Sequence, residues 1–180
     1  MNAHNAIELL KAGNARFISG ALSPKEDYAE DRKRLAEGQH PFAVVLCCSD
    51  SRVAPEIIFD QKLGDLFVIR NAGNVVDDDV LGSIEYTVEH LGTPLVVVLG
   101  HSCCGAVTAT FQGGDLPGHI VDIAKRIMPS LNTGCCIDEN AKRHAIRMAQ
   151  LIEEDEILHH LGVQVIAAFY DIRSGKVEWI

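Results

Sequence analysis

Four continuous apolar runs constrain the fold of this chain more than any other feature of its sequence. They cover Phe42–Cys47, Leu66–Ile69, Leu95–Leu99 and Val163–Tyr170. Runs of this length that are rich in β-branched residues are typical of strands buried on both faces of a sheet. The turn residues Asp171–Gly175 then predict a short last strand.

Helical patterns lie between and before these runs. Apolar residues recur at helical spacing over Ala6–Ile18, Val80–Leu91 and Ala141–Ile152, and Asp77 stands where a helix should begin. The charged stretch Lys25–Glu37 predicts a helix on the surface. Strands that alternate with helices predict an α/β fold with a mainly parallel central sheet and flanking helices.

Composition narrows the class of protein. The 180 residues suit a single domain, 1–180, and 16 Lys and Arg against 25 Asp and Glu give a net charge of −9. An acidic chain without basic runs is a poor nucleic-acid binder. No apolar stretch reaches the ~20 residues that cross a membrane, so we expect a cytoplasmic protein. Six cysteines in three adjacent pairs then need a reason other than disulfides.

Candidate functional residues follow the predicted strands. The first strand leads into Cys47–Arg52, the second into Arg70–Asn74 and the third into Gly100–Gly105. Ligands of open parallel sheets bind beyond the carboxyl ends of the strands. Two of these three ends carry cysteine or histidine, which are soft metal ligands.

Three of these residues can converge on one metal ion. His101 and Cys104 are three residues apart at a loop-to-helix junction, and Cys48 comes from a neighbouring strand end. Two cysteines and one histidine with an open fourth position form a known catalytic zinc arrangement. The remaining cysteines are interpreted as small apolar packing residues, namely Cys47, Cys103, Cys135 and Cys136.

Asp50 and Arg52 lie just beyond Cys48 and can form an ion pair. A carboxylate beside a zinc site has three possible uses. It can ligate the metal, accept a hydrogen bond from metal-bound water, or cap a short helix predicted over Ala54–Phe59.

The motifs Cys48–Val53 and His101–Gly105 resemble those of the β-class carbonic anhydrases. Further matching segments are Phe67–Asn74, Ile84–Val88 and Phe169–Val177. The resemblance extends over most of the chain and implies the fold of that family. It also implies reversible hydration of carbon dioxide to bicarbonate and a proton by zinc-bound hydroxide.

The resemblance also assigns roles to residues. It implies one Zn²⁺ per chain on Cys48, His101 and Cys104, with Asp50 accepting a hydrogen bond from zinc-bound water and Arg52 holding Asp50. One branch of the family closes the site with this aspartate and carries Trp three residues before the first ligand. This chain has Val45 there, so it is more similar to the branch with an open fourth position.

Family members are dimers or multiples of dimers, so the resemblance implies a homodimer or tetramer. Its substrate pocket would be lined by Gln39, Phe67 and Tyr86 from the neighbouring chain, with Ala72 and Gly105 nearby. The N-terminal helices, about residues 5–38, would pack on the partner subunit.

Three alternatives stay open. The same scaffold and zinc ligands also serve hydrolases of COS and CS2. A zinc protein without catalysis is a second alternative, although it would need neither Asp50 nor Arg52. A redox-sensing protein that uses Cys103 or the pair Cys135–Cys136 is the third.

Overall fold

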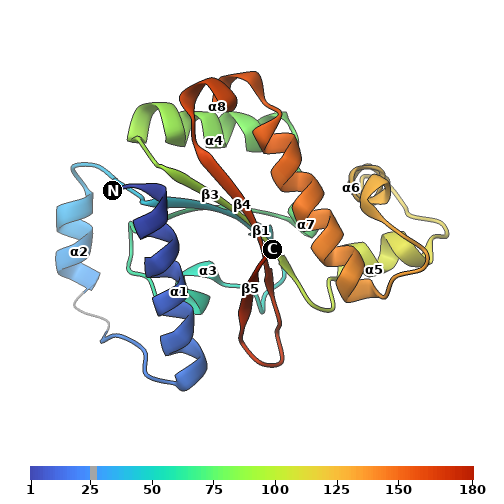
Figure 1. The fold of residues 1–180 in the computed structure, drawn as a ribbon, viewed down its shortest axis with the longest axis horizontal. Helices are drawn as coiled ribbons and strands as arrows, with labels where there is room; N and C mark the ends of the chain where they lie inside the picture. The colour runs from blue at the N-terminus through green and yellow to red at the C-terminus, as the bar shows by residue number, and fades with distance from the viewer. Residues whose placement is uncertain (25–27) are drawn as a thin grey trace.

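A five-stranded sheet forms the centre of the molecule (Figure 1). The computed structural model describes residues 1–24 and 28–180. The strand order is β2-β1-β3-β4-β5, in which the first four strands are parallel and β5 is antiparallel to β4. The strands are β1 (Ala43–Cys48), β2 (Leu66–Asn71), β3 (Leu95–His101), β4 (Gln164–Tyr170) and β5 (Val177–Trp179). The predicted α/β fold with a mainly parallel sheet is confirmed.

Helices flank this sheet and include all those that the sequence predicts. They are α1 (Ala3–Ser19), α2 (Tyr28–Leu35), α3 (Pro55–Ile58), α4 (Asp78–Leu91), α5 (Gly105–Gln112), α6 (Ile120–Ile127), α7 (Ile137–Glu153) and α8 (Glu156–Leu161), with 3-10 turns at Ala72–Asn74 and Met128–Ser130. The predicted surface helix corresponds to α2, which has no buried residue, and its first part, residues 25–27, lies outside the described residues. Asp77 caps α4 by accepting a hydrogen bond from the Val80 N–H group at 2.9 Å.

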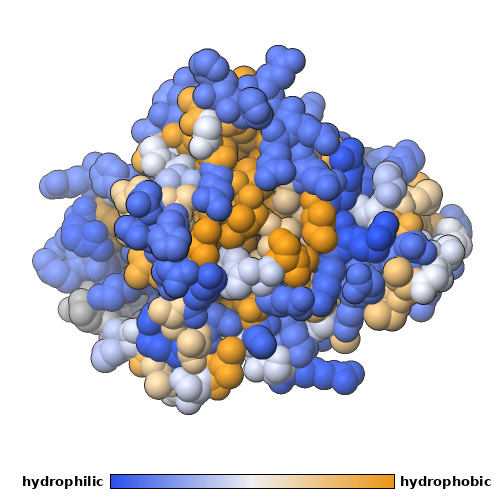
Figure 2. Space-filling view, in the orientation of Figure 1, coloured by the Kyte–Doolittle hydropathy of each residue, from blue (hydrophilic) through white to orange (hydrophobic). Residues whose placement is uncertain are grey.

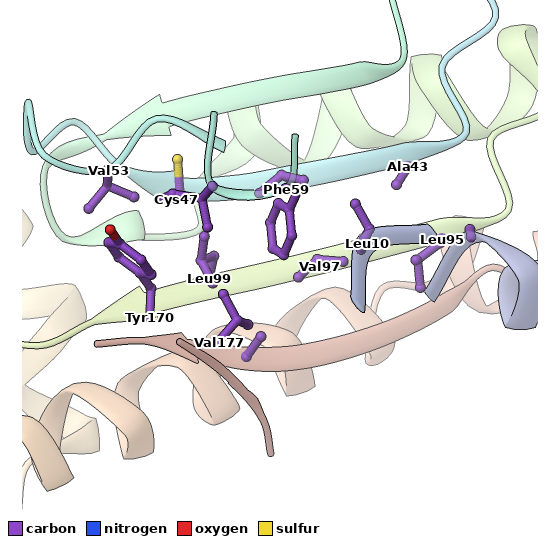
Figure 3. Packing of buried hydrophobic residues seen from close by; sticks show 14 residues of the cluster. Leu10, Ala43, Cys47, Val53, Phe59, Leu95, Val97, Leu99, Tyr170 and Val177 are labelled. Atoms are coloured by element: carbon purple, nitrogen blue, oxygen red, sulfur yellow. The ribbon is translucent and has the colours of Figure 1, made fainter. Parts of the chain in front are cut away.

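Two apolar layers arise from the alternation of side chains along the strands. On one face, Val45 and Cys47 of β1 pack with Val97 of β3 beneath α1 and the loop after α3 (Figure 3). On the other face, Val44 and Leu46 of the same strand pack against α4, α7 and α8. Because β1 and β3 are covered on both faces, every one of their residues is buried.

Strand β2 departs from its prediction. The run Leu66–Ile69 suggests burial on both faces, but its residues are only half-buried. The reason is position: β2 pairs with β1 on one side and forms the edge of the sheet on the other. An edge strand keeps unpaired backbone groups on its outer side.

The surface is polar over most of the face seen in Figure 1, with apolar side chains gathered near its middle, over β4 and β5 (Figure 2). A small cavity there is lined by Ile7, Ile166, Trp179 and Ile180, among others. Within residues 1–24 and 28–180, every helix is too short or too polar to cross a bilayer.

Candidate metal centre

Cys48, His101 and Cys104 meet at the carboxyl end of the sheet. Their potential ligand atoms all lie within 4.8 Å of one another, and all three residues are buried. Cys48 ends β1, His101 ends the adjacent strand β3, and Cys104 is the residue from which α5 begins. The convergence predicted from spacing is therefore present in one chain.

A strained turn makes this convergence possible. Between the two ligands of the second motif, Cys103 adopts φ +56°, in the left-handed region that L-residues rarely occupy. Its backbone N–H group donates to the Asp138 carboxylate at 2.8 Å. This contact fixes Cys103 against the first turn of α7. The chain can then reverse direction between His101 and Cys104, so both side chains face the same point.

The tautomer of His101 follows from its neighbours. Its Nδ1 atom lies 2.9 Å from the Ser102 carbonyl oxygen, which can only accept, so Nδ1 carries the proton. The Nε2 atom then offers a lone pair, and it is buried without a hydrogen-bond partner. Buried polar atoms are nearly always satisfied, so this orphaned nitrogen beside two thiols fits a metal ion. The set of two sulfurs and one imidazole favours zinc over magnesium or calcium.

The electrostatics of the thiols suit a metal ligand set as well. The Cys104 side chain hydrogen-bonds to Cys48, which lowers the pKa of Cys48 and raises that of Cys104. The backbone N–H groups of Gly73 and Asp50 also donate to the Cys48 sulfur and lower the pKa of Cys48 further. The site thus stabilises negative charge on the Cys48 sulfur, and metals bind the thiolate form.

Asp50 and Arg52 form a bidentate ion pair next to the cluster. The Arg52 Nε atom donates to Oδ1 of Asp50 at 2.9 Å, and its Nη2 atom donates to Oδ2 at 2.7 Å. This pairing holds the pKa of Asp50 well below its usual range. The alternative role of Asp50 as a helix cap is wrong, because α3 begins after Ala54 without a side-chain cap.

Two residues support the site in ways that the sequence did not reveal. Arg70 at the end of β2 donates to the carbonyl oxygen of Asp50 at 2.8 Å and also contacts that of Cys48. The Gly73 N–H group donates to the Cys48 sulfur at 3.3 Å. Two sequence signals pointed to these residues, their place after a predicted strand and their place in the matching segment Phe67–Asn74, but neither signal assigned them a role.

The remaining cysteines divide into two groups. Cys47 points into the core on the opposite face of β1 from Cys48, and burial raises its pKa to about 12, so its interpretation as a packing residue is confirmed (Figure 3). The same interpretation is wrong for Cys103 and Cys136, which are exposed, whereas Cys135 is half-buried. All three lie in connections between helices and strands.

The predicted pocket residues are not gathered around the cluster of this one chain. Ala72 and Gly105 lie next to it in sequence, beside Gly73 and Cys104, and are exposed. Phe67 pairs with Val44, four residues before Cys48, which places it roughly 13 Å away along the strand.

The other two pocket residues face solvent. Gln39 is exposed in the loop before β1 and lines a cleft with Leu35 and Leu66. Tyr86 on α4 is 49% exposed and contacts His90.

Comparison with known proteins agrees with this geometry. Residues 43–177 match the family model described as carbonic anhydrase. Carbonic anhydrase 2 of Mycobacterium tuberculosis is 43% identical over 185 aligned positions, which cover 95% of this chain and 89% of the relative.

Two solved structures extend the comparison. A β-carbonic anhydrase of Aspergillus fumigatus superposes with a TM-score of 0.77 at 27% identity, covering 85% of this chain and 81% of that one. A tetrameric β-carbonic anhydrase of Sordaria macrospora shares the fold, with a TM-score of 0.73 at 24% identity, covering 98% and 95%.

Proposed function

This chain belongs to the carbonic anhydrase family, and on that premise we propose that it catalyses the reversible hydration of carbon dioxide to bicarbonate and a proton. The observation that carries the proposal is the buried cluster of Cys48, His101 and Cys104 beside an ionised carboxylate. We further propose that these three residues hold one Zn²⁺ per chain. Zinc in such a site lowers the pKa of a coordinated water and so supplies a nucleophile near neutral pH.

Asp50 orients that water in our proposal. An ionised carboxylate can only accept hydrogen bonds, so Asp50 would accept a hydrogen bond from the O–H group of the nucleophile. This orientation would leave an oxygen lone pair free to face the carbon of CO2. Arg52 holds both carboxylate oxygens. This pairing keeps Asp50 ionised and away from the metal ligands, so the fourth coordination position stays available.

We also propose that the active pocket is completed by a second copy of the chain. The half-buried edge strand β2 offers unpaired backbone groups and apolar side chains for a homodimer or tetramer. In such an assembly Gln39, Phe67 and Tyr86 of one chain line the pocket of the other, opposite Ala72 and Gly105. Helix α2, without a buried residue of its own, is suited to packing on the partner subunit.

The single domain 1–180 is then the catalytic unit, and the cytoplasm is the compartment we propose for it. All six cysteines are free. Free thiols persist in reducing compartments, whereas oxidising ones favour disulfides.

Stopped-flow CO2 hydration on zinc-loaded protein tests the proposed function. The thiolates of Cys48 and Cys104 neutralise the charge of a bound Zn²⁺, so we expect a rate that is low near neutral pH and rises toward moderately alkaline pH. Sulfide release from COS and CS2, measured in parallel, is the control for substrate class. Sulfide release without CO2 hydration, or neither activity with one zinc held per chain, would contradict the proposal.

A further inference from the structure

A buried histidine on α7 lies behind the metal centre and takes no part in the proposed chemistry. His144 is fully buried, and its Nε2 atom lies 2.7 Å from the Gly73 carbonyl oxygen. Its Nδ1 atom lies 3.1 Å from the Ser130 hydroxyl oxygen. Both ring nitrogens are therefore engaged inside the protein.

These contacts define one tautomer. The Gly73 carbonyl can only accept, so Nε2 of His144 carries the proton and donates it. Nδ1 is then an acceptor, and the Ser130 hydroxyl donates to it. Burial lowers the pKa of His144 to about 4, so the ring is neutral and this arrangement persists at physiological pH.

Gly73 connects the histidine to the metal centre. While its carbonyl accepts from His144, its N–H group donates to the Cys48 sulfur at 3.3 Å. Its φ of +74° lies in the left-handed region that favours glycine, and a Cβ atom here would come within 2.8 Å of the Ile127 Cδ1 atom. The Asn71 side chain holds the other end of this turn through two 2.8 Å hydrogen bonds to the backbone of Val75.

A hydrogen bond to a ligand sulfur matters because it stabilises negative charge there and weakens donation to the metal. The direction of the Gly73 N–H group depends on where the turn is held. We propose that His144 is a positioning residue of the metal centre, which acts through Gly73 to set the donor strength of the Cys48 thiolate. This inference rests on the proposed zinc site, and it extends beyond the ligands to a side chain that touches none of them.

The test compares His144→Leu with His144→Gln. Leucine fills much of the same space without a donor, whereas the glutamine Nε2 atom can reach the position of the histidine Nε2–H group. Each variant is loaded with Co²⁺, whose sulfur-to-metal charge-transfer band reports thiolate donation, and zinc release to a chelator is timed in parallel. Ile152→Ala, a core substitution on the same helix, is the matched control for lost packing.

We expect His144→Leu to move the band to longer wavelength, because the Cys48 thiolate loses its hydrogen bond from Gly73. We also expect zinc release to speed up roughly 10- to 100-fold, because the turn no longer holds Cys48 in place, and this outweighs the stronger donation of its sulfur. His144→Gln should restore the band and most of the slow release. A wild-type band and release rate in His144→Leu, or an equal shift in Ile152→Ala, would overturn the inference. If His144→Leu does not fold, Ser130→Ala must give a smaller shift in the same direction, and an unchanged band would likewise overturn it.

The outcome is separable from that of the proposed function. The band and the release rate need only a bound metal, whereas CO2 hydration by the wild-type protein tests the reaction. Shifted bands in a protein without hydration would keep the inference and refute the function. Active protein with unshifted bands would do the reverse.

Discussion

The carboxyl end of the sheet and its β2 edge differ in how far a single chain completes them. At the carboxyl end, the metal cluster is buried, the Gly73 N–H group donates to Cys48, the Ser102 carbonyl oxygen accepts from His101, and Asp138 accepts from the turn at Cys103. Along the β2 edge, strand residues are half-buried and Gln39 and Tyr86 are exposed. The metal-binding groups thus come from one chain, and we propose that a second chain completes the walls of the substrate pocket.

Cys48→Ser is the substitution with the largest expected effect on the metal cluster. We expect loss of the metal and a fall of CO2 hydration to the uncatalysed rate, because two ligands remain and a hydroxyl is a poor substitute for a thiolate. Metal content by atomic emission and stopped-flow hydration measure this.

The adjacent Cys47→Ser is the control. It should keep the metal and lower the free energy of unfolding by about 1–3 kcal/mol, because it buries a hydroxyl among apolar side chains. Equal metal loss in both variants would mean that position on β1, rather than the sulfur, decides metal binding.

Mixing two damaged variants tests whether the pocket spans two chains. We expect Asp50→Asn to keep zinc and lose hydration roughly 10²- to 10³-fold, since it removes the charged acceptor. Gln39→Ala should also keep zinc and lose activity. In a mixed dimer, one site combines an intact Asp50 with an intact Gln39 from the other chain.

Random exchange of subunits should therefore restore about a quarter of wild-type activity, as symmetry dictates for two equivalent sites. The double variant mixed with itself is the control and should stay inactive. If activity does not recover although the subunits have exchanged, Asp50 and Gln39 belong to the site of the same chain, and the pocket does not span two chains.

Low pH should reduce the free energy of unfolding through protonation of His144. The unfolded chain protonates this residue with a pKa near 6.5, whereas burial lowers the folded pKa to about 4. Stability is therefore lost as pH falls from 6.5 toward 4, by roughly 3 kcal/mol for this residue. Urea unfolding at several pH values, compared with His144→Gln, isolates the contribution. Parallel curves for the two proteins would contradict it.

The smallest effect is expected at the strained turn. Cys103→Gly relieves a φ of +56°, and the gain is partly offset by the greater freedom of glycine in the unfolded chain, for a net stabilisation of about 0.5 kcal/mol. Zinc content and hydration should not change, because the Cys103 side chain is exposed and only its backbone supports the turn. Loss of zinc in this variant would give the thiol a role that the structure does not assign to it.

Much of the site could be predicted because its residues are close in sequence to strand ends. Parallel strands bring their carboxyl ends to one edge, so Cys48 and His101 had to approach each other once β1 and β3 were neighbours. The Asp50–Arg52 pair could also be predicted, because the two residues are only two positions apart. By contrast, the burial of β2 was overestimated, because an apolar run is the same whether its strand lies inside a sheet or at its edge.

The α/β fold, the three residues that converge at the sheet and the carboxylate next to them could be predicted from the sequence, because periodicity and the position of residues after strands can be seen along the chain. The groups that support these residues became visible only in the folded structure. Arg70 reaches the Asp50 backbone from another strand, and His144 reaches Gly73 from a helix 71 positions away. Such contacts depend on how distant segments pack, and a local sequence pattern does not predict that packing.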